Sequence, residues 1–255
     1  MLLAIDIGNT NIVLGVFQDR TLVEHWKIKT VADKTCDEYY VLLKGLFSHA
    51  TINTEQIEGV ILSSVVPPLG PVFQKLGRDM FHVKVLTVGP GLKTGMSILY
   101  ENPQEVGADR IVSAVAAMEK YGKPCIVVDF GTATTFDAVS AQGEYLGGVI
   151  APGVQISAEA LYLKTAKLPQ IEIIKPHTVI GRTTVSSMQS GLYHGYVGLV
   201  SNIIAMLKLE LGNSAKVITT GGFASVILHE IEAVDGHEPC LVLDGLRILY
   251  EKNQK

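Results

Sequence analysis

The sequence predicts an α/β protein made of two related halves, and three observations lead to this fold class. Short apolar runs of strand length alternate with longer runs that have helical spacing. An acid two residues before a glycine, at the end of an apolar strand, occurs at Asp6–Gly8 and again at Asp129–Gly131. The two copies lie 123 residues apart (129 − 6 = 123), close to half of the 255 residues. Because Asp-x-Gly alone is a common triplet, the shared context of strand, polar turn and second strand is what indicates a duplicated fold.

The first half is predicted to begin with a three-stranded meander followed by helices and strands in alternation. A tight turn at 8–11 separates two apolar strands, and a third strand passes through Trp26. Thr35 and Glu38 have the spacing of a capping box, which predicts that a helix begins there. The expected strands are 2–7, 12–17, 60–65 and 83–88, and the expected helices are 39–47 and 69–81.

The second half is predicted to repeat this opening. An apolar strand leads into Asp129, a turn rich in threonine follows, and a second strand begins at Phe136. The later elements are a long helix at 186–211, a strand at 216–220 and a closing helix at 243–252. An apolar stripe on the long helix, which includes Tyr193 and Tyr196, is typical of a core or of a subunit interface, and we favour the interface.

Composition excludes several classes of protein. Hydrophobic residues make up 47% and charged residues 18%, which suits a substantial core and is too little charge for a disordered chain. The net charge of −4 with no basic run disfavours nucleic acid as a partner. The three cysteines are far apart and form no CxxC pair, which argues against a disulfide scaffold and a zinc site. Without a signal-peptide pattern or an apolar run of about 18 residues, we expect a soluble, unprocessed, cytoplasmic protein with no membrane partner.

The turn after the first strand has the chemistry of a phosphate site. An aspartate in an apolar strand is costly to bury unless it binds something, and at Asp6 a cation near phosphate is the best candidate. Gly8 allows backbone N–H groups to approach a phosphate, and the Asn and Thr side chains that follow add neutral donors. The alternative is a plain hairpin turn with a capping aspartate.

Two further segments can contact the same ligand. Residues 129–135 repeat the acid and glycine with threonine hydroxyls in place of amides, which provides donors for a second side of a polyphosphate. Residues 219–223 follow a strand and contain Gly221 and Gly222, and we expect them to open a helix whose N-terminus lies near a nucleotide. A simple Gly-Gly turn is the alternative.

The order of these three segments resembles the actin, Hsp70 and sugar-kinase superfamily. That resemblance implies the actin-like ATPase fold, with two duplicated ribonuclease-H-like domains and ATP in the cleft between them; we place the domains at 1–118 and 119–255. The segment 89–95 looks like a P-loop but lacks its Gly-Lys-Thr spacing, so we interpret it as a connecting loop.

A more specific resemblance depends on residues 105–111, Glu-Val-Gly-Ala-Asp-Arg-Ile, at the start of an apolar helical run. An acid and an arginine in the first turn of a helix can be no more than capping and a salt bridge. Together with 6–11 and 129–135, however, the segment resembles the type III pantothenate kinases. Further matches to that family are Gly147–Gly148, Pro152–Gly153, 181–184, Ser190–Gly191, 219–222 and 241–246, so the resemblance extends over nearly the whole chain.

The resemblance implies the activity and a role for each site residue. The activity is phosphorylation of pantothenate by ATP to 4′-phosphopantothenate, the first step of coenzyme A biosynthesis, by a homodimer that needs Mg²⁺ and K⁺ or NH₄⁺. The implied catalytic base is Asp109. The implied pantothenate site contains Tyr100, Gly107, Ala108, Asp109, Arg110 and, across a dimer interface, Thr184. The implied ATP contacts are Asp6, Ile7, Gly8, Asn9, Thr10, Asn11, Ile12, Val13 and Thr132. The implied metal ligands are Asp129 for the monovalent cation and Asp6 for Mg²⁺, the latter through water.

Two other functions fit the same scaffold. One is a kinase for another small hydroxylated substrate such as a sugar, since one fold supports many activities. The other is a nucleotide-binding regulator that acts through partners, although the presence of Asp109 and Arg110 favours an enzyme. The seven histidines are scattered and form no His-x-x-x-His pair, so we expect them to be structural or solvated.

Overall fold

The structure is a computed structural model that describes residues 1–254, and these residues form two compact units. Unit 1 contains Met1–Gly95, Glu101–Ala116 and the C-terminal segment from Leu241, whereas unit 2 contains Met96–Tyr100 and Ala117–Cys240. The division expected from the sequence, 1–118 and 119–255, is different, because the closing helix packs with unit 1. In both divisions the chain passes from the first part to the second within the same helix, Ala108–Tyr121.

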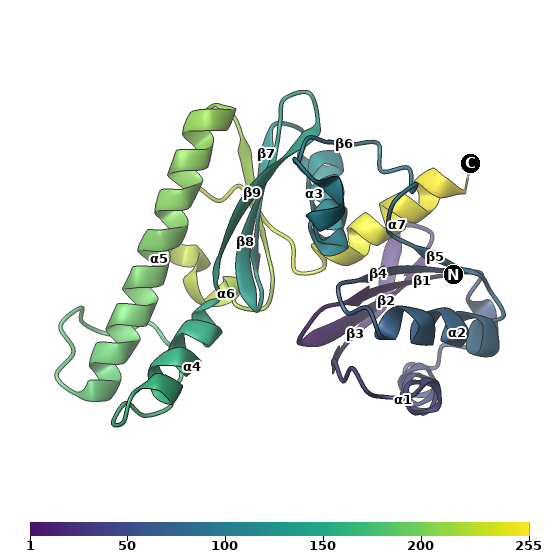
Figure 1. The fold of residues 1–255 in the computed structure, drawn as a ribbon, viewed down its shortest axis with the longest axis horizontal. Helices are drawn as coiled ribbons and strands as arrows, with labels where there is room; N and C mark the ends of the chain where they lie inside the picture. Colours follow the sequence, from purple (N-terminus) through teal and green to yellow (C-terminus); the bar gives the residue numbers. More distant parts are fainter. Residues whose placement is uncertain (255) are drawn as a thin grey trace. The chain divides into compact units, whose positions relative to one another are not determined.

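Unit 1 is built on a five-stranded sheet in the order β3-β2-β1-β4-β5 (Figure 1). β1 pairs antiparallel with β2 and parallel with β4, so the meander lies on one side of β1 and the parallel strands on the other. The strands are β1 (Leu2–Ile7), β2 (Asn11–Gln18), β3 (Thr21–Lys29), β4 (Gly59–Ser64) and β5 (Val85–Thr87). The helices are α1 (Cys36–His49), a short 3₁₀ turn (Thr54–Gln56), α2 (Leu69–Phe81), a second 3₁₀ turn (Pro103–Glu105), the first part of α3 (Ala108–Tyr121), and α7 (Leu241–Asn253).

The two faces of the unit 1 sheet are covered by different helices. On one face, alternate residues of β1, β2 and β4 form a core with aromatic and aliphatic residues of α1 and α2. On the other face α7 lies close to the strands, because a Cβ on Gly15 would come within 2.7 Å of Leu243 and one on Gly59 would collide with Tyr250. Asp6 belongs to this second face, since its neighbours Ile5 and Ile7 point into the α1 and α2 core.

Unit 2 is built on a six-stranded sheet in the order β11-β10-β7-β8-β9-β6. The core cluster on one face joins β7, β8 and β10 to the long helix α5, which Figure 1 shows running along the sheet. The strands are β6 (Ser97–Ile98), β7 (Cys125–Phe130), β8 (Ala133–Val139), β9 (Glu144–Pro152), β10 (Lys216–Thr220) and β11 (Gly236–His237). The helices are α4 (Val154–Lys164), α5 (Thr184–Leu211), α6 (Ala224–Ile227) and a 3₁₀ turn (Leu228–Glu230).

The two sheets have the same topology, as expected from the repeated Asp-x-Gly. In unit 2 the strands β9-β8-β7-β10-β11 repeat the order of β3-β2-β1-β4-β5, with the same two antiparallel and two parallel pairings. Leu2–Ile7 and Thr21–Lys29 coincide with Cys125–Phe130 and Glu144–Pro152 after a shift of 123 residues. The predicted fold class, an α/β protein with two duplicated ribonuclease-H-like domains, is therefore confirmed at the level of strand order.

Several elements differ from the sequence-based expectation. The helix expected after Gly222 is only the four residues Ala224–Ile227, and α4 was not predicted. Tyr193 and Tyr196 are buried in the core of unit 2, so the interface interpretation was wrong for these two residues. The segment 89–95 contains neither helix nor strand, as expected for a connecting loop. Among residues 1–254, none of the helices combines the length and the apolar character that crossing a bilayer requires.

Candidate nucleotide and substrate sites in the two units

The turn after β1 is held closely by backbone and side-chain hydrogen bonds. The Gly8 N–H donates to the Asn11 carbonyl at 3.0 Å, which closes the turn. Thr30, just after β3, donates its hydroxyl to the Gly8 carbonyl at 2.7 Å and its N–H to the Thr10 carbonyl at 3.0 Å. The side chains of Asn9 and Thr10 stay exposed. The turn is therefore a fixed loop that presents neutral donors to solvent.

The eight consecutive residues 6–13, which with Thr132 are expected to contact ATP, do not have equivalent side chains. Ile7 and Ile12 are fully buried among the core residues on the α1 and α2 face, so only their backbone can meet a nucleotide. Asp6 is half-buried on the opposite face and is paired in register with Val13 on β2 and Ser63 on β4. The polar contacts of this segment must therefore come from Asp6 and from the turn residues.

Asp6 suits Mg²⁺ bound together with a nucleotide. Residues 1–254 contain no cluster of three or more histidine, cysteine, aspartate or glutamate residues arranged to hold a metal. Mg²⁺ in nucleotide enzymes usually keeps several waters and takes one or two carboxylates plus phosphate oxygens, so a single carboxylate beside a phosphate turn is enough. Asp6 fits that pattern. The described residues provide no metal site made only of protein ligands.

The start of α3 brings a carboxylate and an arginine together over a glycine. The Arg110 N–H donates to Asp109 Oδ1 at 2.9 Å, and the N–H groups of Arg110 and Ile111 also approach the Gly107 carbonyl. A Cβ on Gly107 would lie 2.5 Å from Asp109 Oδ1. The absence of a side chain at Gly107 is therefore what allows the carboxylate to fold back over the first turn of the helix.

The environment of Asp109 favours a base that can also be protonated. Burial raises the pKa of Asp109 above its ordinary value, because a charged carboxylate loses hydration there. The Arg110 N–H and the Arg110 guanidinium act in the opposite direction on the same pKa but do not cancel the effect of burial. A carboxylate whose pKa is raised in this way accepts a proton more readily than an exposed one.

In unit 2 the turn after β7 is packed closely by two glycines from other segments. A Cβ on Gly221, which follows β10, would lie 2.4 Å from Asp129 Oδ1 and 2.6 Å from the Phe130 nitrogen. A Cβ on Gly153, which precedes α4, would lie 2.3 Å from the Thr132 carbonyl oxygen and 2.7 Å from that of Gly131. The late Gly-Gly motif thus serves a close backbone approach to Asp129, and not the start of a long helix.

Asp129 has hydroxyl-bearing residues at its paired positions on both neighbouring strands. The Asp129 carboxylate lies in the same turn as the Gly131 and Thr132 carbonyls, and its strand neighbours Thr135 and Thr220 both carry hydroxyls. Carboxylate and carbonyl oxygens are the ligands that hard monovalent cations take in proteins. The donor set therefore fits K⁺ or NH₄⁺, while Thr132 is exposed and open to a nucleotide.

Comparison with known proteins identifies the family. A family model described as type III pantothenate kinase matches residues 2–206. The chain is 53% identical over 253 residues to a type III pantothenate kinase of Myxococcus xanthus, covering 99% of each chain. It is also 53% identical over 255 residues to a type III pantothenate kinase of Geobacter sulfurreducens, covering 100% of each. The chain belongs to the type III pantothenate kinase family.

A solved structure supports the fold of this family member. The structure of MreB 5 of Spiroplasma citri bound to AMPPNP aligns with a TM-score of 0.54 at 12% identity, covering 99% of this chain and 96% of the other. At that identity the likeness shows the fold alone. It agrees with the actin-like class expected from the sequence.

Tyr100 and Thr184 of this pantothenate kinase family member belong to unit 2. The half-buried Tyr100 follows β6 and lays its ring against Gly147 of β9, where a Cβ would lie 3.2 Å from the ring. Thr184 is exposed at the first turn of α5, directly after the N-cap Thr183. It lines a hollow of about 880 Å³ whose other lining residues are Leu161, Leu168, Gly181, Arg182, Thr183, Ser187, Met188, Gly191 and Leu192. Asp6 and the 107–110 segment lie in unit 1, and Asp129, Thr132, Tyr100 and Thr184 in unit 2.

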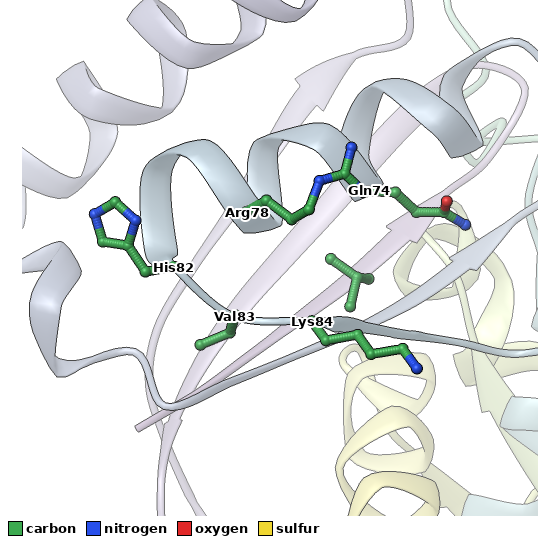
Figure 2. A pocket seen from close by; sticks show the side chains of 6 residues that line it. Gln74, Arg78, His82, Val83 and Lys84 are labelled. Atoms are coloured by element: carbon green, nitrogen blue, oxygen red, sulfur yellow. The ribbon is translucent and has the colours of Figure 1, made fainter.

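A separate hollow of about 530 Å³ lies between α2 and β5 and contains none of the predicted site residues (Figure 2). Arg78, His82 and Lys84, all exposed, line this hollow together with Gln74, Val83 and Val85. Arg78 is in the last turn of α2 and His82 is its C-cap, where the helix dipole favours positive charge. The basic residues Arg78 and His82 therefore have a structural explanation at this helix end.

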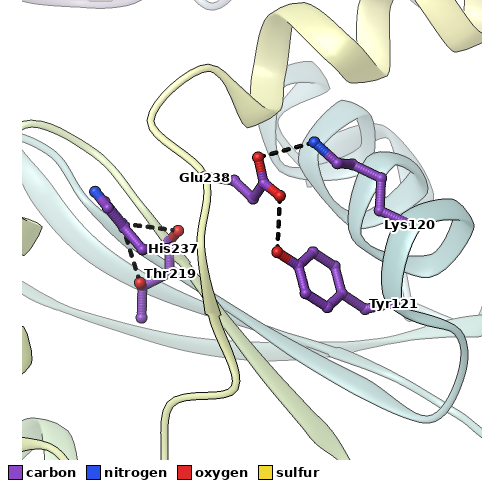
Figure 3. Close-up of polar contacts among 5 residues, drawn as sticks. All are labelled: Lys120, Tyr121, Thr219, His237 and Glu238. Carbon is purple, nitrogen blue, oxygen red and sulfur yellow. Dashed lines mark hydrogen bonds and ion pairs between the residues drawn. The ribbon is translucent and has the colours of Figure 1, made fainter.

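A polar network joins the end of α3 to the segment before α7 within unit 2 (Figure 3). Glu238 accepts a hydrogen bond from Lys120 at 2.8 Å and one from the Tyr121 hydroxyl at 2.7 Å. Burial acts to raise the pKa of Glu238, but these two hydrogen bonds outweigh it, so the pKa is lowered. Next to it, His237 Nδ1 lies 3.2 Å from the Thr219 hydroxyl, which ties β11 to β10.

Proposed function

We propose that this chain transfers the γ-phosphoryl group of ATP to the primary hydroxyl of pantothenate, and that Asp109 is the general base. The product is 4′-phosphopantothenate, and the reaction is the first step of coenzyme A biosynthesis. The observation that carries the proposal is the carboxylate of Asp109, folded over Gly107 with a raised pKa, in a member of the type III pantothenate kinase family.

Phosphoryl transfer requires the protein to align the two substrates and to neutralise the charge on the transferred group, and little more. As the pantothenate oxygen forms its bond to the γ-phosphorus, the bond from that phosphorus to the bridging oxygen breaks and ADP leaves. The hydroxyl proton passes to the Asp109 carboxylate. Arg110 holds the substrate with the Gly107 and Ala108 backbone, and no covalent enzyme intermediate is needed. Tyr100 contributes a hydroxyl and a flat apolar face to the same substrate.

The two phosphate turns have different roles in this proposal. Asp6 binds Mg²⁺ through water, and Gly8 to Asn11 contact the phosphates through backbone N–H groups and neutral side chains. Mg²⁺ supplies charge neutralisation for the transferred group. Asp129 binds K⁺ or NH₄⁺ through its carboxylate, and Thr132 contacts ATP.

We further propose that the enzyme is a homodimer in which Thr184 reaches the pantothenate of the partner subunit. Thr184 is exposed at one end of α5, and large apolar side chains are exposed on α4, on α5 and on the segment between them. Examples are Leu163, Ile180 and Leu209, which are 71%, 80% and 74% exposed, and contact with a second subunit would cover such groups. The cytoplasm is the proposed location, where free thiols such as its three cysteines persist.

The test is a direct assay with a matched pair of variants. Purified protein with ATP, Mg²⁺ and K⁺ should phosphorylate pantothenate, and the rate should fall when Na⁺ replaces K⁺. Asp109→Asn should lower kcat by roughly 10²- to 10⁴-fold, as loss of a general base does, with ATP affinity unchanged. A folded, dimeric protein that leaves pantothenate unmodified would refute the substrate. Near-normal turnover by Asp109→Asn would remove Asp109 from the base role.

A further inference from the structure

Ser63 on β4 is a buried hydroxyl for which protein packing offers no partner. Its side chain is completely buried, and its Oγ makes no hydrogen bond to any described residue. By contrast, the next residue, Ser64, exchanges hydrogen bonds with the backbone of Val66 at 3.2 Å. A buried hydroxyl without a partner is costly, so its position requires an explanation.

The register of the sheet places Ser63 directly beside Asp6. The parallel strands β1 and β4 pair Asp6 with Ser63, and paired residues on adjacent strands project from the same face about 4.8 Å apart. On its other side Asp6 is paired with Val13, which is apolar. The hydroxyl of Ser63 is therefore the one polar side chain that a paired strand position places beside the Asp6 carboxylate.

The same arrangement occurs in the second unit. There β7 and β10 pair Asp129 with Thr220, so a hydroxyl residue again lies beside the motif aspartate on the neighbouring parallel strand. Thr220 is 5% exposed, which is close to the burial of Ser63. The strands β4 and β10 are equivalent in the two sheets but do not follow the 123-residue offset of the other repeated strands. A hydroxyl beside the aspartate in both units therefore points to a requirement of the aspartate.

We propose that Ser63 is a positioning residue for Asp6: when Mg²⁺ and ATP bind, its hydroxyl rotates and donates a hydrogen bond to one oxygen of the Asp6 carboxylate. This leaves the other oxygen directed to the water shell of the metal. Because Ser63 is sealed from solvent, it acts on the carboxylate and does not touch the nucleotide. The inference rests on the proposed role of Asp6 as the Mg²⁺ residue.

A simpler account is that β4 needs only a small side chain at position 63. The two accounts differ in what alanine does. If only size matters, Ser63→Ala leaves metal and nucleotide binding unchanged and removes an unsatisfied hydroxyl. If the hydroxyl positions Asp6, the same variant weakens binding of the metal–nucleotide pair.

The experiment measures binding of AMPPNP to the full chain by titration calorimetry, with and without Mg²⁺. We expect Ser63→Ala to raise the Kd of Mg²⁺–AMPPNP about 10-fold, the loss typical of a hydrogen bond to a charged group, and to leave the metal-free Kd within about 2-fold. Ser63→Thr, which keeps the hydroxyl, should restore most of the affinity. Ser64→Ala, which removes the adjacent hydroxyl from the opposite face, is the matched control and should bind like the parent.

A double-mutant cycle with Asp6→Asn separates positioning from a general structural effect. Ser63→Ala should add almost nothing to Asp6→Asn, because both changes act through one carboxylate. Equal weakening with and without Mg²⁺, or full additivity with Asp6→Asn, would overturn the inference. If Ser63→Ala fails to fold, Ser63→Cys, which has the same shape and a weak donor, takes its place.

The same series tells the two proposals apart. Weakened Mg²⁺–AMPPNP binding by Asp6→Asn together with normal binding by Ser63→Ala refutes only the role of Ser63. Normal binding by Asp6→Asn refutes the Asp6 metal role and this inference with it. Phosphorylation of pantothenate by the unmodified protein tests the activity independently of both.

Discussion

Replacing Gly107 by alanine should lower catalysis without weakening the fold. The added Cβ would lie 2.5 Å from Asp109 Oδ1, whereas ordinary contact begins at 3.4 Å, so the oxygen must move by about 0.9 Å. The obstacle is the end of a side chain, and Gly107 is not among the glycines with positive φ. Alanine is thus compatible with the backbone at position 107, and its main effect is to displace the Asp109 carboxylate.

The expected size of the effect follows from that displacement. A shift of about 1 Å in a catalytic group costs roughly 10²-fold in rate, so kcat for pantothenate phosphorylation should fall by about 10- to 100-fold. The KM for ATP should stay near the parent value, because Asp6 and its turn are separate in sequence. The unfolding free energy should change by less than about 0.5 kcal/mol, since surface-like substitutions without a backbone conflict have small effects.

Gly45→Ala provides the matched control. Gly45 is exposed in the middle of α1, and a Cβ there would meet nothing within 4 Å. This variant should gain about 0.5–1 kcal/mol from helix propensity and keep the parent kcat. Steady-state kinetics and urea unfolding measure both quantities. An unchanged kcat for Gly107→Ala, with a crystal structure showing Asp109 displaced, would refute the idea that the position of this carboxylate limits the rate.

Three further predictions concern other contacts. Because burial raises the pKa of Asp109, the free energy of unfolding should fall as the pH rises through that pKa. At pH 7 the parent buries a charged carboxylate and Asp109→Asn does not, so the variant should unfold at a temperature equal to or above the parent's. Glu238→Gln should cost about 1 kcal/mol at pH 7, and because the pKa of Glu238 is lowered, the difference should vanish in urea titrations as the pH falls through it. Gly153→Ala would place a Cβ 2.3 Å from the Thr132 carbonyl and should raise the K⁺ concentration for half-maximal activity several-fold; an unchanged K⁺ response would contradict the packing argument.

The fold was predictable because its signals are local. The apolar run 69–81 between Pro68 and His82 has helical spacing, and the helix has those bounds. The Asp-x-Gly repeat indicated that the two halves share one fold, and residues 2–7 and 125–130 do form equivalent strands. The assignment of the closing helix was less successful, because its apolar residues Leu243 and Tyr250 pack against strand residues that lie 228 (243 − 15) and 191 (250 − 59) positions earlier in the chain.

The candidate site was only partly accessible from sequence. Asp6 and Asp129 are marked by glycines in the same turn, and the 107–110 segment by its place at a helix start. Gly153 and Gly221, in contrast, matter because they have no side chain. The positions where a Cβ would lie are already approached by atoms of segments that are distant in the sequence. Family resemblance marked both glycines without giving this reason.

The position of Ser63 beside Asp6 could not be predicted from the sequence. In the sequence it is one of two adjacent serines at the end of a buried strand, and nothing in its neighbours distinguishes it from Ser64. The distinction comes from strand register: one residue earlier or later on β4, the hydroxyl would point to the α1 and α2 core and could not lie beside Asp6. Because Thr220 occupies the same register beside Asp129, the hydroxyl is tied to the aspartate in both units while the surrounding sequences differ. The duplicated element is thus larger than the Asp-x-Gly turn, and extends to the parallel strand that packs beside it.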